Sequence, residues 1–249
     1  MPLFEICVDS VAGMRAAIEA GAARVELCAA LLEGGITPSI GMVGQAVAAA
    51  SGRIKVHVII RPRGGDFLYD RDEFATMRRD LAAAKEAGAD GVVIGLLDAD
   101  GRVDEERSGE LIAAARPLSV TFHRAFDVAR DPDLSLDAVI RLGVDRLLTS
   151  GQAPSVLEGA PVIRRLIDRA AGRLMVMPGG DITARNAARI AAETGASEFH
   201  FAAFAPAASA MRWRNETIFM GGALRPPEYD RAATTASAVR AVMTAFAAS

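Results

Sequence analysis

Residues 21–28 read Gly-Ala-Ala-Arg-Val-Glu-Leu-Cys, and this short stretch shows how the chain is organised. It begins with a glycine, the residue most common just after a helix, and runs directly into a strand. Within the strand, Val25 and Leu27 alternate with Glu26 and Cys28. Since strand side chains point alternately to opposite faces, the strand has one apolar face and one polar, chemically capable face.

The same order recurs along the chain: glycines at 88, 143 and 195 each end a helical stretch, and a strand follows. We expect strands near residues 4–8, 24–28, 55–60, 91–95, 119–123, 146–149, 174–177 and 198–201. We expect helices near residues 10–20, 40–51, 70–87, 104–115, 134–142, 160–171, 183–194 and 230–247. Eight such units predict a single-domain (β/α)₈ TIM barrel over residues 1–249. An open doubly wound sheet is the alternative, but its strands would be apolar on both faces.

The segment 202–229 is less regular and holds Gly221-Gly222 and Pro226-Pro227. Together with the C-terminal helix it completes the same domain over residues 202–249. It is interpreted either as a loop over the barrel mouth or as an oligomer contact.

Composition narrows the class of protein. A net charge of −3 and an isoelectric point near 5.7 argue against nucleic-acid or membrane partners. The N-terminal residues lack the basic region of a signal peptide, and no apolar run approaches the roughly 18 residues of a spanning helix. With only two cysteines, a cytoplasmic protein without a structural disulfide is expected.

In a barrel the helix-facing side of each strand is apolar, so the polar set points inward. Active sites of this fold lie at the carboxyl ends of the strands. The predicted inward residues are Glu5, Cys7, Glu26, Cys28, His57, Arg61, Thr121, His123, Thr149, Glu198 and His200. Strand 91–95 contributes the small residues Gly91 and Gly95 to the inward face, which leaves space inside the barrel.

Cys7 and Cys28 occupy comparable positions on consecutive strands, where neighbouring backbones lie about 4.8 Å apart. Their sulfurs can therefore hold one ion, and soft thiolates favour Cu(I) and other soft or borderline metals. The alternative is that both thiols pack as small apolar groups.

All three histidines fall in the inward register together with glutamates and an arginine. Such a set suits general acid–base chemistry, or a structural network of paired charges. The loop after strand 119–123 adds Arg124 and Asp127, which either line the mouth or pair with each other. The candidate catalytic residues are Glu5, Glu26, His57, Arg61, His123, Arg124, Asp127 and His200.

Two loops carry signals for anion binding. Arg61 and Arg63 lie beside Gly64-Gly65, and Gly179-Gly180 follows the seventh strand, where barrels commonly bind phosphate. The strand that follows continues without a glycine, which weakens the phosphate interpretation; tight turns are the alternative in both loops.

Six stretches, taken in order, resemble the CutC family of copper homeostasis proteins: residues 4–10, 21–28, 34–39, 60–67, 121–127 and 148–152. The resemblance covers roughly residues 4–201. It implies a (β/α)₈ barrel, a cytoplasmic location, a homo-oligomer, and Cu(I) ligands at Cys7 and Cys28. The chain departs from the family pattern near residues 201–203, where a Ser/Gly-rich turn is more common.

Two functional hypotheses follow. The first is a copper-binding protein that holds Cu(I) between Cys7 and Cys28. The second is an isomerase, lyase or hydrolase acting on a small polar or anionic metabolite, with Glu5 or Glu26 as base, His123 or His200 as acid, and Arg61 or Arg124 as anion clamp. A bare scaffold for protein contacts explains the polar interior least well.

Overall fold

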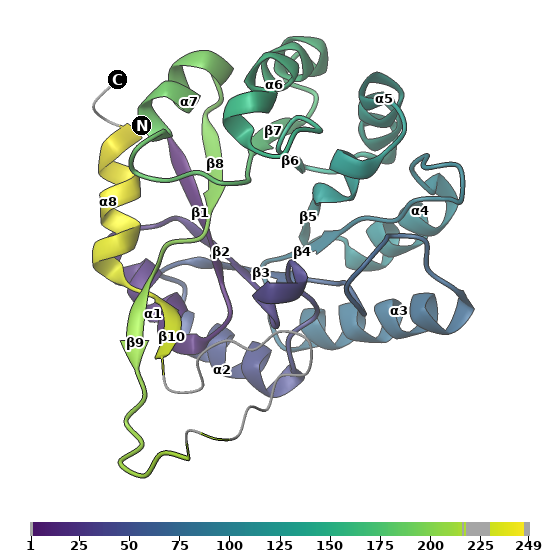
Figure 1. Ribbon diagram of the computed structural model, residues 1–249. Coiled ribbons are helices and arrows are strands. Elements are labelled where there is room, and N and C mark those ends of the chain that lie inside the picture. The colour runs from purple at the N-terminus through teal and green to yellow at the C-terminus, as the bar shows by residue number, and fades with distance from the viewer. Residues whose placement is uncertain (1, 216, 218–229, 247–249) are drawn as a thin grey trace.

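The computed structural model describes residues 2–215, 217 and 230–246 of the chain. A ring of strands lies at its centre, and helices surround the ring (Figure 1). The strands are β1 (Leu3–Val8), β2 (Arg24–Leu27), β3 (Lys55–Ile59), β4 (Gly91–Ile94), β5 (Ser119–Phe122), β6 (Arg146–Thr149), β7 (Met175–Pro178), β8 (Glu198–Phe201), β9 (Phe204–Ala208) and β10 (Asp230–Thr234). The helices are α1 (Val11–Ala20), α2 (Ile40–Ala50), α3 (Arg71–Glu86), α4 (Glu105–Ala115), α5 (Pro132–Leu142), α6 (Val156–Ala170), α7 (Ala187–Thr194) and α8 (Ala236–Phe246), with short 3₁₀ turns η1 (Leu31–Glu33) and η2 (Arg124–Val128).

The eight-stranded sheet is parallel throughout, in the order β7-β6-β5-β4-β3-β2-β1-β8. A parallel bridge between Gly179 and His200 joins β7 to β8 and closes the ring. The predicted (β/α)₈ barrel is confirmed, and the open sheet is excluded.

Helices end where the sequence places glycine. Gly21 follows α1 with a φ of 85° and Gly143 follows α5 with a φ of 69°, and both backbone N–H groups bond to carbonyls of the last turn. This left-handed geometry costs glycine little and turns the chain back toward the next strand.

The main apolar core lies between the ring and the helices, where strand residues such as Ile6, Val25, Val58 and Val120 are fully buried. A second, smaller cluster of Cys7, Cys28, Ile59 and Val93 is separate from it. The strands therefore have an apolar outer face and an inner face of mixed chemistry.

Two elements near the C-terminus differ from expectation. The predicted helix over 230–247 starts too early, because residues 230–234 form β10, which pairs antiparallel with β9. The side chain of Thr235 accepts from the N–H of Ala238, so α8 begins only at Ala236. The predicted helix over 183–194 likewise begins at Ala187, since the Asn186 side chain holds Thr183 in a turn.

The segment predicted to be irregular, 202–229, contributes β9 and an extension that projects from the barrel (Figure 1). Residues 216 and 218–229 lie outside the described residues. Among the described residues no helix combines the length and apolar character needed to cross a bilayer.

Candidate functional site

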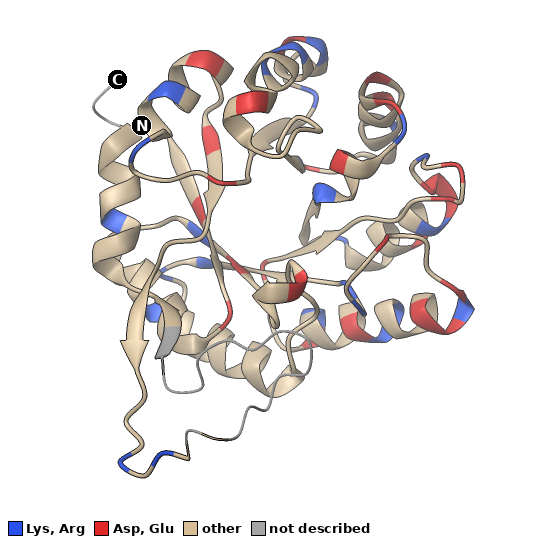
Figure 2. Ribbon diagram, viewed as in Figure 1, with Lys and Arg blue, Asp and Glu red and all other residues tan. Residues whose placement is uncertain are grey.

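All of the residues predicted to face inward are buried, and all but one of them lie on the inner face of the ring. Glu5, Cys28 and Thr121 are almost wholly inaccessible, and the three histidines are at most 9% exposed. Figure 2 shows charged residues on strands of the ring as well as on the outer helices. The exception is Thr149 in β6. Arg146 pairs with Thr121 and Leu148 pairs with Met177, so Arg146 and Leu148 are the residues of β6 that face inward. The prediction for Thr149 was wrong because the run Leu147-Leu148 hides the alternation.

Charged pairs fill the end of the barrel nearest the strand starts. The Arg24 guanidinium bonds to Glu5 through Nε and to Glu198 through Nη2, the latter at 2.6 Å. Arg146 Nε approaches Glu198 at 2.9 Å. Buried charges are tolerated when they are paired in this way. Neither Arg24 nor Arg146 was among the predicted inward residues. Arg24 lies two residues before the inward Glu26, so alternation could have found it, whereas the run Leu147-Leu148 hides the alternation that would have pointed to Arg146.

Glu5 links that network to His200, since its Oε1 lies 2.8 Å from His200 Nδ1. Burial alone would raise the pKa of Glu5, but the hydrogen bond with His200 and the charge of Arg24 hold it well below its usual range. Burial opposes the charge on His200, yet contacts with Cys7 and Glu5 raise its pKa well above the ordinary value. The pair is therefore a carboxylate bound to an imidazolium, whose other nitrogen, Nε2, faces away from Glu5.

The two thiols lie next to each other, with 3.8 Å between Cys7 Sγ and Cys28 Sγ. A hydrogen bond from Cys28 lowers the pKa of Cys7 to about 6, against the opposing effect of burial. The same bond, together with burial, raises the pKa of Cys28 well above its ordinary value. The two shifts are opposite in direction, so Cys7 is the thiol of the pair that loses its proton more readily.

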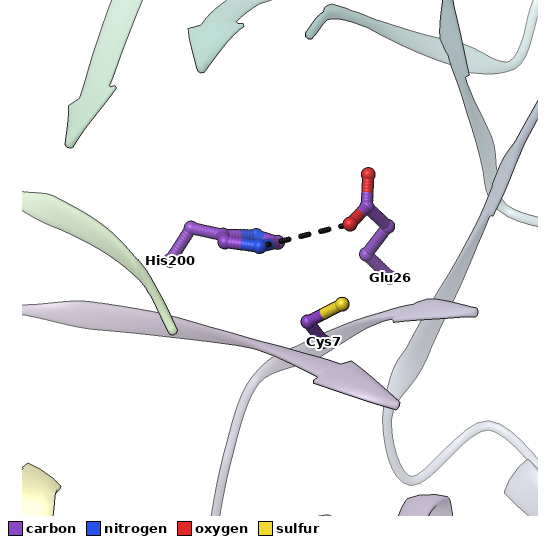
Figure 3. A group of neighbouring side chains, drawn as sticks. All are labelled: Cys7, Glu26 and His200. Carbon is purple, nitrogen blue, oxygen red and sulfur yellow. Dashed lines mark ion pairs between the residues drawn. The ribbon is translucent and has the colours of Figure 1, made fainter. Parts of the chain in front are cut away.

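Glu26 completes this group. The ligand atoms of Cys7, Glu26 and His200 all lie within 4.8 Å of one another, and the three side chains converge from β1, β2 and β8 (Figure 3). Glu26 Oε2 is 3.6 Å from His200 Nε2 and 3.5 Å from Cys28 Sγ. Burial raises the pKa of Glu26 to about 8, partly offset by His200. Two sulfurs, one imidazole and one carboxyl therefore share a small volume that suits a soft metal ion.

His57 and His123 are held in pockets made by glycines of the neighbouring strand. A Cβ on Gly91 would lie 2.5 Å from His57 Nε2, and one on Gly95 would lie 2.3 Å from His123 Cε1. Burial lowers the pKa of His57 to about 4 and that of His123 to about 3. Both imidazoles are therefore neutral at physiological pH, in contrast to His200.

A cavity of about 670 Å³ lies at the carboxyl ends of the strands, where this fold carries its active sites. The predicted site residues that line it are Cys7, Glu26, Arg61, His123, Arg124, Asp127, Gly179, Gly180 and His200. Three predicted site residues do not line the cavity: Glu5, Cys28 and His57. Glu5 contacts His200 and Cys28 contacts Cys7, both of which line it, whereas His57 lies beside Glu5. Arg63 does not line the cavity either, and its guanidinium is paired with Glu73 and Asp66.

At the mouth, Arg124 Nε donates to Asp127 at 2.6 Å, so the two residues both pair and line the cavity. The Asp127 carboxylate also accepts from the Thr149 hydroxyl and from the backbone N–H of Ser150 and Gln152. It thereby ties η2 to the loop after β6. Gly180, at a φ of 137°, leaves space for the Arg124 guanidinium.

A family model, curated relatives and a solved structure all point to the same family. The model of the CutC family matches residues 2–205. The mouse "Copper homeostasis protein cutC homolog" is 49% identical, over 96% of this chain and 87% of its own length, and a Chromobacterium violaceum CutC family protein is 51% identical, over 98% of each. The crystal structure of the putative copper homeostasis protein CutC from Streptococcus agalactiae superposes with a TM-score of 0.77 at 35% identity, covering 81% of this chain and 98% of that one.

Proposed function

Because the chain belongs to the CutC family, we propose that it acts in copper homeostasis by binding one Cu(I) ion between Cys7 and Cys28. The observation that carries the proposal is the pair of buried sulfurs 3.8 Å apart. An ion about 2.3 Å from each sulfur, the length of a typical metal–thiolate bond, bridges that gap without moving either strand. Soft thiolates select Cu(I) over hard cations.

His200 is the third ligand in this proposal. Its Nε2 lies near Cys7 and Glu26, and its Nδ1 is bound to the Glu5 carboxylate. A carboxylate behind a metal-binding imidazole fixes the ring and strengthens the other nitrogen as a ligand. Binding would release the protons on His200 and on the Cys28 thiol, since metal ligands must be deprotonated.

An anaerobic titration of the reduced protein with Cu(I), in competition with a chromophoric chelator, tests the proposal. We expect one equivalent per chain in the wild type and none in the Cys7→Ala/Cys28→Ala double variant. Met177→Leu is the matched control, since it removes another buried sulfur of the ring, one that accepts from Arg24. Unchanged stoichiometry in the double variant would remove the proposal.

Acid–base catalysis on a small molecule is a second candidate, favoured by a cavity of about 670 Å³. Drug-sized ligands occupy pockets of roughly 300–1,000 Å³, far more than an ion needs. Glu26 and His200 would exchange protons with the substrate. Mass spectrometry of metabolite pools incubated with the wild type and with Glu26→Gln tests this; conversion by neither protein would leave only the binding function.

A reducing, cytoplasmic location and a homo-oligomer also belong to the proposal. The dithiol needs a reducing compartment to stay free for copper. Met211 and Trp213, 60% and 79% exposed on the extension after β9, support a contact between copies. Light scattering of the wild type and of Trp213→Ser tests the assembly: a monomeric wild type would exclude it.

A further inference from the structure

Two buried N–H groups at the cavity wall, Nε of Arg61 and Nε2 of His123, form no well-aligned hydrogen bond among the described residues, and the Tyr69 hydroxyl is the polar group that lies near the Arg61 guanidinium. Buried polar atoms in folded proteins are almost always partnered, so each exception calls for a physical reason. Both residues are at most 6% exposed. Neither belongs to the group of Cys7, Glu26 and His200.

The proton position on His123 follows from its contacts. Its Nδ1 accepts the backbone N–H of Ala125 at 3.1 Å, which leaves that nitrogen without a proton. Burial, reinforced by Arg61, lowers the pKa of His123 to about 3, so the ring is neutral. The single ring proton is therefore on Nε2, and Nε2 is a hydrogen-bond donor without an acceptor.

Arg61 carries a buried positive charge that no described carboxylate pairs with. Its Nη1 donates to the carbonyls of Glu33 and Gly35, and its Nη2 donates to the carbonyl of Gly65. These bonds hold the guanidinium in one orientation but leave its charge uncompensated. An arginine in this state suits one further, anionic acceptor.

Phe67 lies beside both donor residues, Arg61 and His123, at the wall of the cavity. Its ring centroid lies 5.1 Å from Cζ of Arg61 and 5.1 Å from the centre of the His123 ring. Phe67 is half-buried on the loop after β3, and Leu31 and Ile59 add apolar surface to the same cavity. This wall thus combines two donors and one positive charge with apolar surroundings, and the Phe67 ring is the group that a ligand would displace to reach both nitrogens.

We propose that this wall binds a small organic monocarboxylate, whose carboxylate accepts hydrogen bonds from Arg61 Nε and His123 Nε2. One negative charge matches the one unpaired guanidinium, and the apolar lining suits the rest of an organic acid. Inorganic phosphate, a dianion with four oxygens, fits two donors less well. The two proposed donors, Arg61 and His123, are distinct from the proposed copper ligands, although Ile59 of this wall packs against the two cysteines.

Calorimetric titration of the copper-free protein with acetate, lactate and benzoate tests the proposal, with inorganic phosphate as the competing probe. We expect at least one carboxylate to bind saturably below about 10 mM. His123→Asn keeps an acceptor for Ala125 but removes the Nε2 donor, and should weaken binding about tenfold. His123→Gln keeps a donor at the Nε2 position and should bind within about threefold of the wild type.

Further variants separate this site from the other proposals. Arg61→Lys should lose binding, and an unchanged ¹⁵N NMR spectrum elsewhere shows that the variant is folded. The Cys7→Ala/Cys28→Ala variant should bind the carboxylate as the wild type does. No saturable carboxylate binding, equal binding by His123→Asn, tighter binding of phosphate, or loss of binding in the cysteine variant would each overturn the proposal.

Discussion

Oε1 of Glu5 lies 2.8 Å from Nδ1 of His200, and the other oxygen of the same carboxylate binds the Arg24 guanidinium. The fully buried Glu5 carboxylate thus binds two side chains: the Arg24 guanidinium, which belongs to the network of buried charges, and the His200 imidazole, which lies near the sulfurs. Glu198 also belongs to the network of buried charges, where it binds Arg24 and Arg146, but it does not bind His200.

Glu5→Gln is expected to lower both stability and copper affinity. Loss of the charge leaves Arg24 partly unpaired in the interior, a change that costs about 3–5 kcal/mol of unfolding free energy for buried pairs. It also weakens the support behind His200, for which roughly 10- to 100-fold in metal affinity is typical. Urea unfolding and chelator competition measure the two effects.

Glu198→Gln is the matched control for that prediction. It should destabilise the protein by a comparable amount through Arg24 and Arg146, yet leave copper affinity within about threefold of the wild type. Equal loss of copper affinity in both variants would mean that Glu5 acts through stability alone.

Alanine at Gly91 or Gly95 should destabilise the protein by about 1–3 kcal/mol, because the new methyl group would meet a histidine ring at 2.5 or 2.3 Å. Gly44→Ala provides the comparison, since no atom lies near its Cβ position and it occupies the interior of α2. There alanine should be neutral or stabilising by about 0.5–1 kcal/mol. Thermal unfolding of the three variants distinguishes steric overlap from a general effect of losing glycine.

Much of this architecture could be predicted from local patterns. Glycine after helices such as α1, α5 and α7, and alternation within strands such as 4–8 and 24–28, reflect geometry that each segment imposes on itself. Alternation therefore placed Glu5, Cys7, Glu26, Cys28 and the histidines inside the ring without knowledge of their partners.

The rest depends on contacts between distant segments. Leu147-Leu148 has no alternation to read, and only the pairing with Thr121 and Met177 shows which residue faces inward. Strands β9 and β10 form from alanine-rich segments that stabilise each other across more than 20 intervening residues. Likewise, the strand positions predict that Cys7 and Cys28 lie close together, but the opposite shifts in their pKa arise from the hydrogen bond between the two sulfurs, whose direction the sequence does not give.

Asp127→Asn should destabilise the mouth of the barrel by about 1–3 kcal/mol. Asparagine keeps an oxygen that can accept from Thr149, Ser150 and Gln152, as Oδ1 does. An amide nitrogen in the place of Oδ2, however, cannot accept from Arg124 Nε or from the Ser150 hydroxyl, so both of those bonds are lost. Glu105→Gln removes a carboxylate whose partner, Arg141, is exposed, so its cost should stay below about 1 kcal/mol. Hydrogen exchange should speed up in residues 149–153 of the first variant only, and unchanged exchange there would contradict the role given to Asp127.

His57 makes the stability of the barrel depend on pH in a definite direction. Burial lowers its pKa from 6.5 to about 4, and the charge of Arg24 adds to the effect while Glu5 opposes it. Between pH 6.5 and 4 the unfolded chain therefore takes up a proton at this residue that the folded protein does not, so His57 stabilises the folded state less as the pH falls.

Replacing His57 with leucine tests this, because leucine fills a similar volume without titrating. Relative to the wild type, the unfolding free energy of His57→Leu should gain on the order of 3 kcal/mol between pH 7 and pH 4, a figure set by the fall in the pKa of His57 from 6.5 to about 4. Because other groups titrate equally in both proteins, the difference between their urea unfolding free energies isolates His57. A difference that stays constant across this range would show that His57 is protonated in the folded barrel.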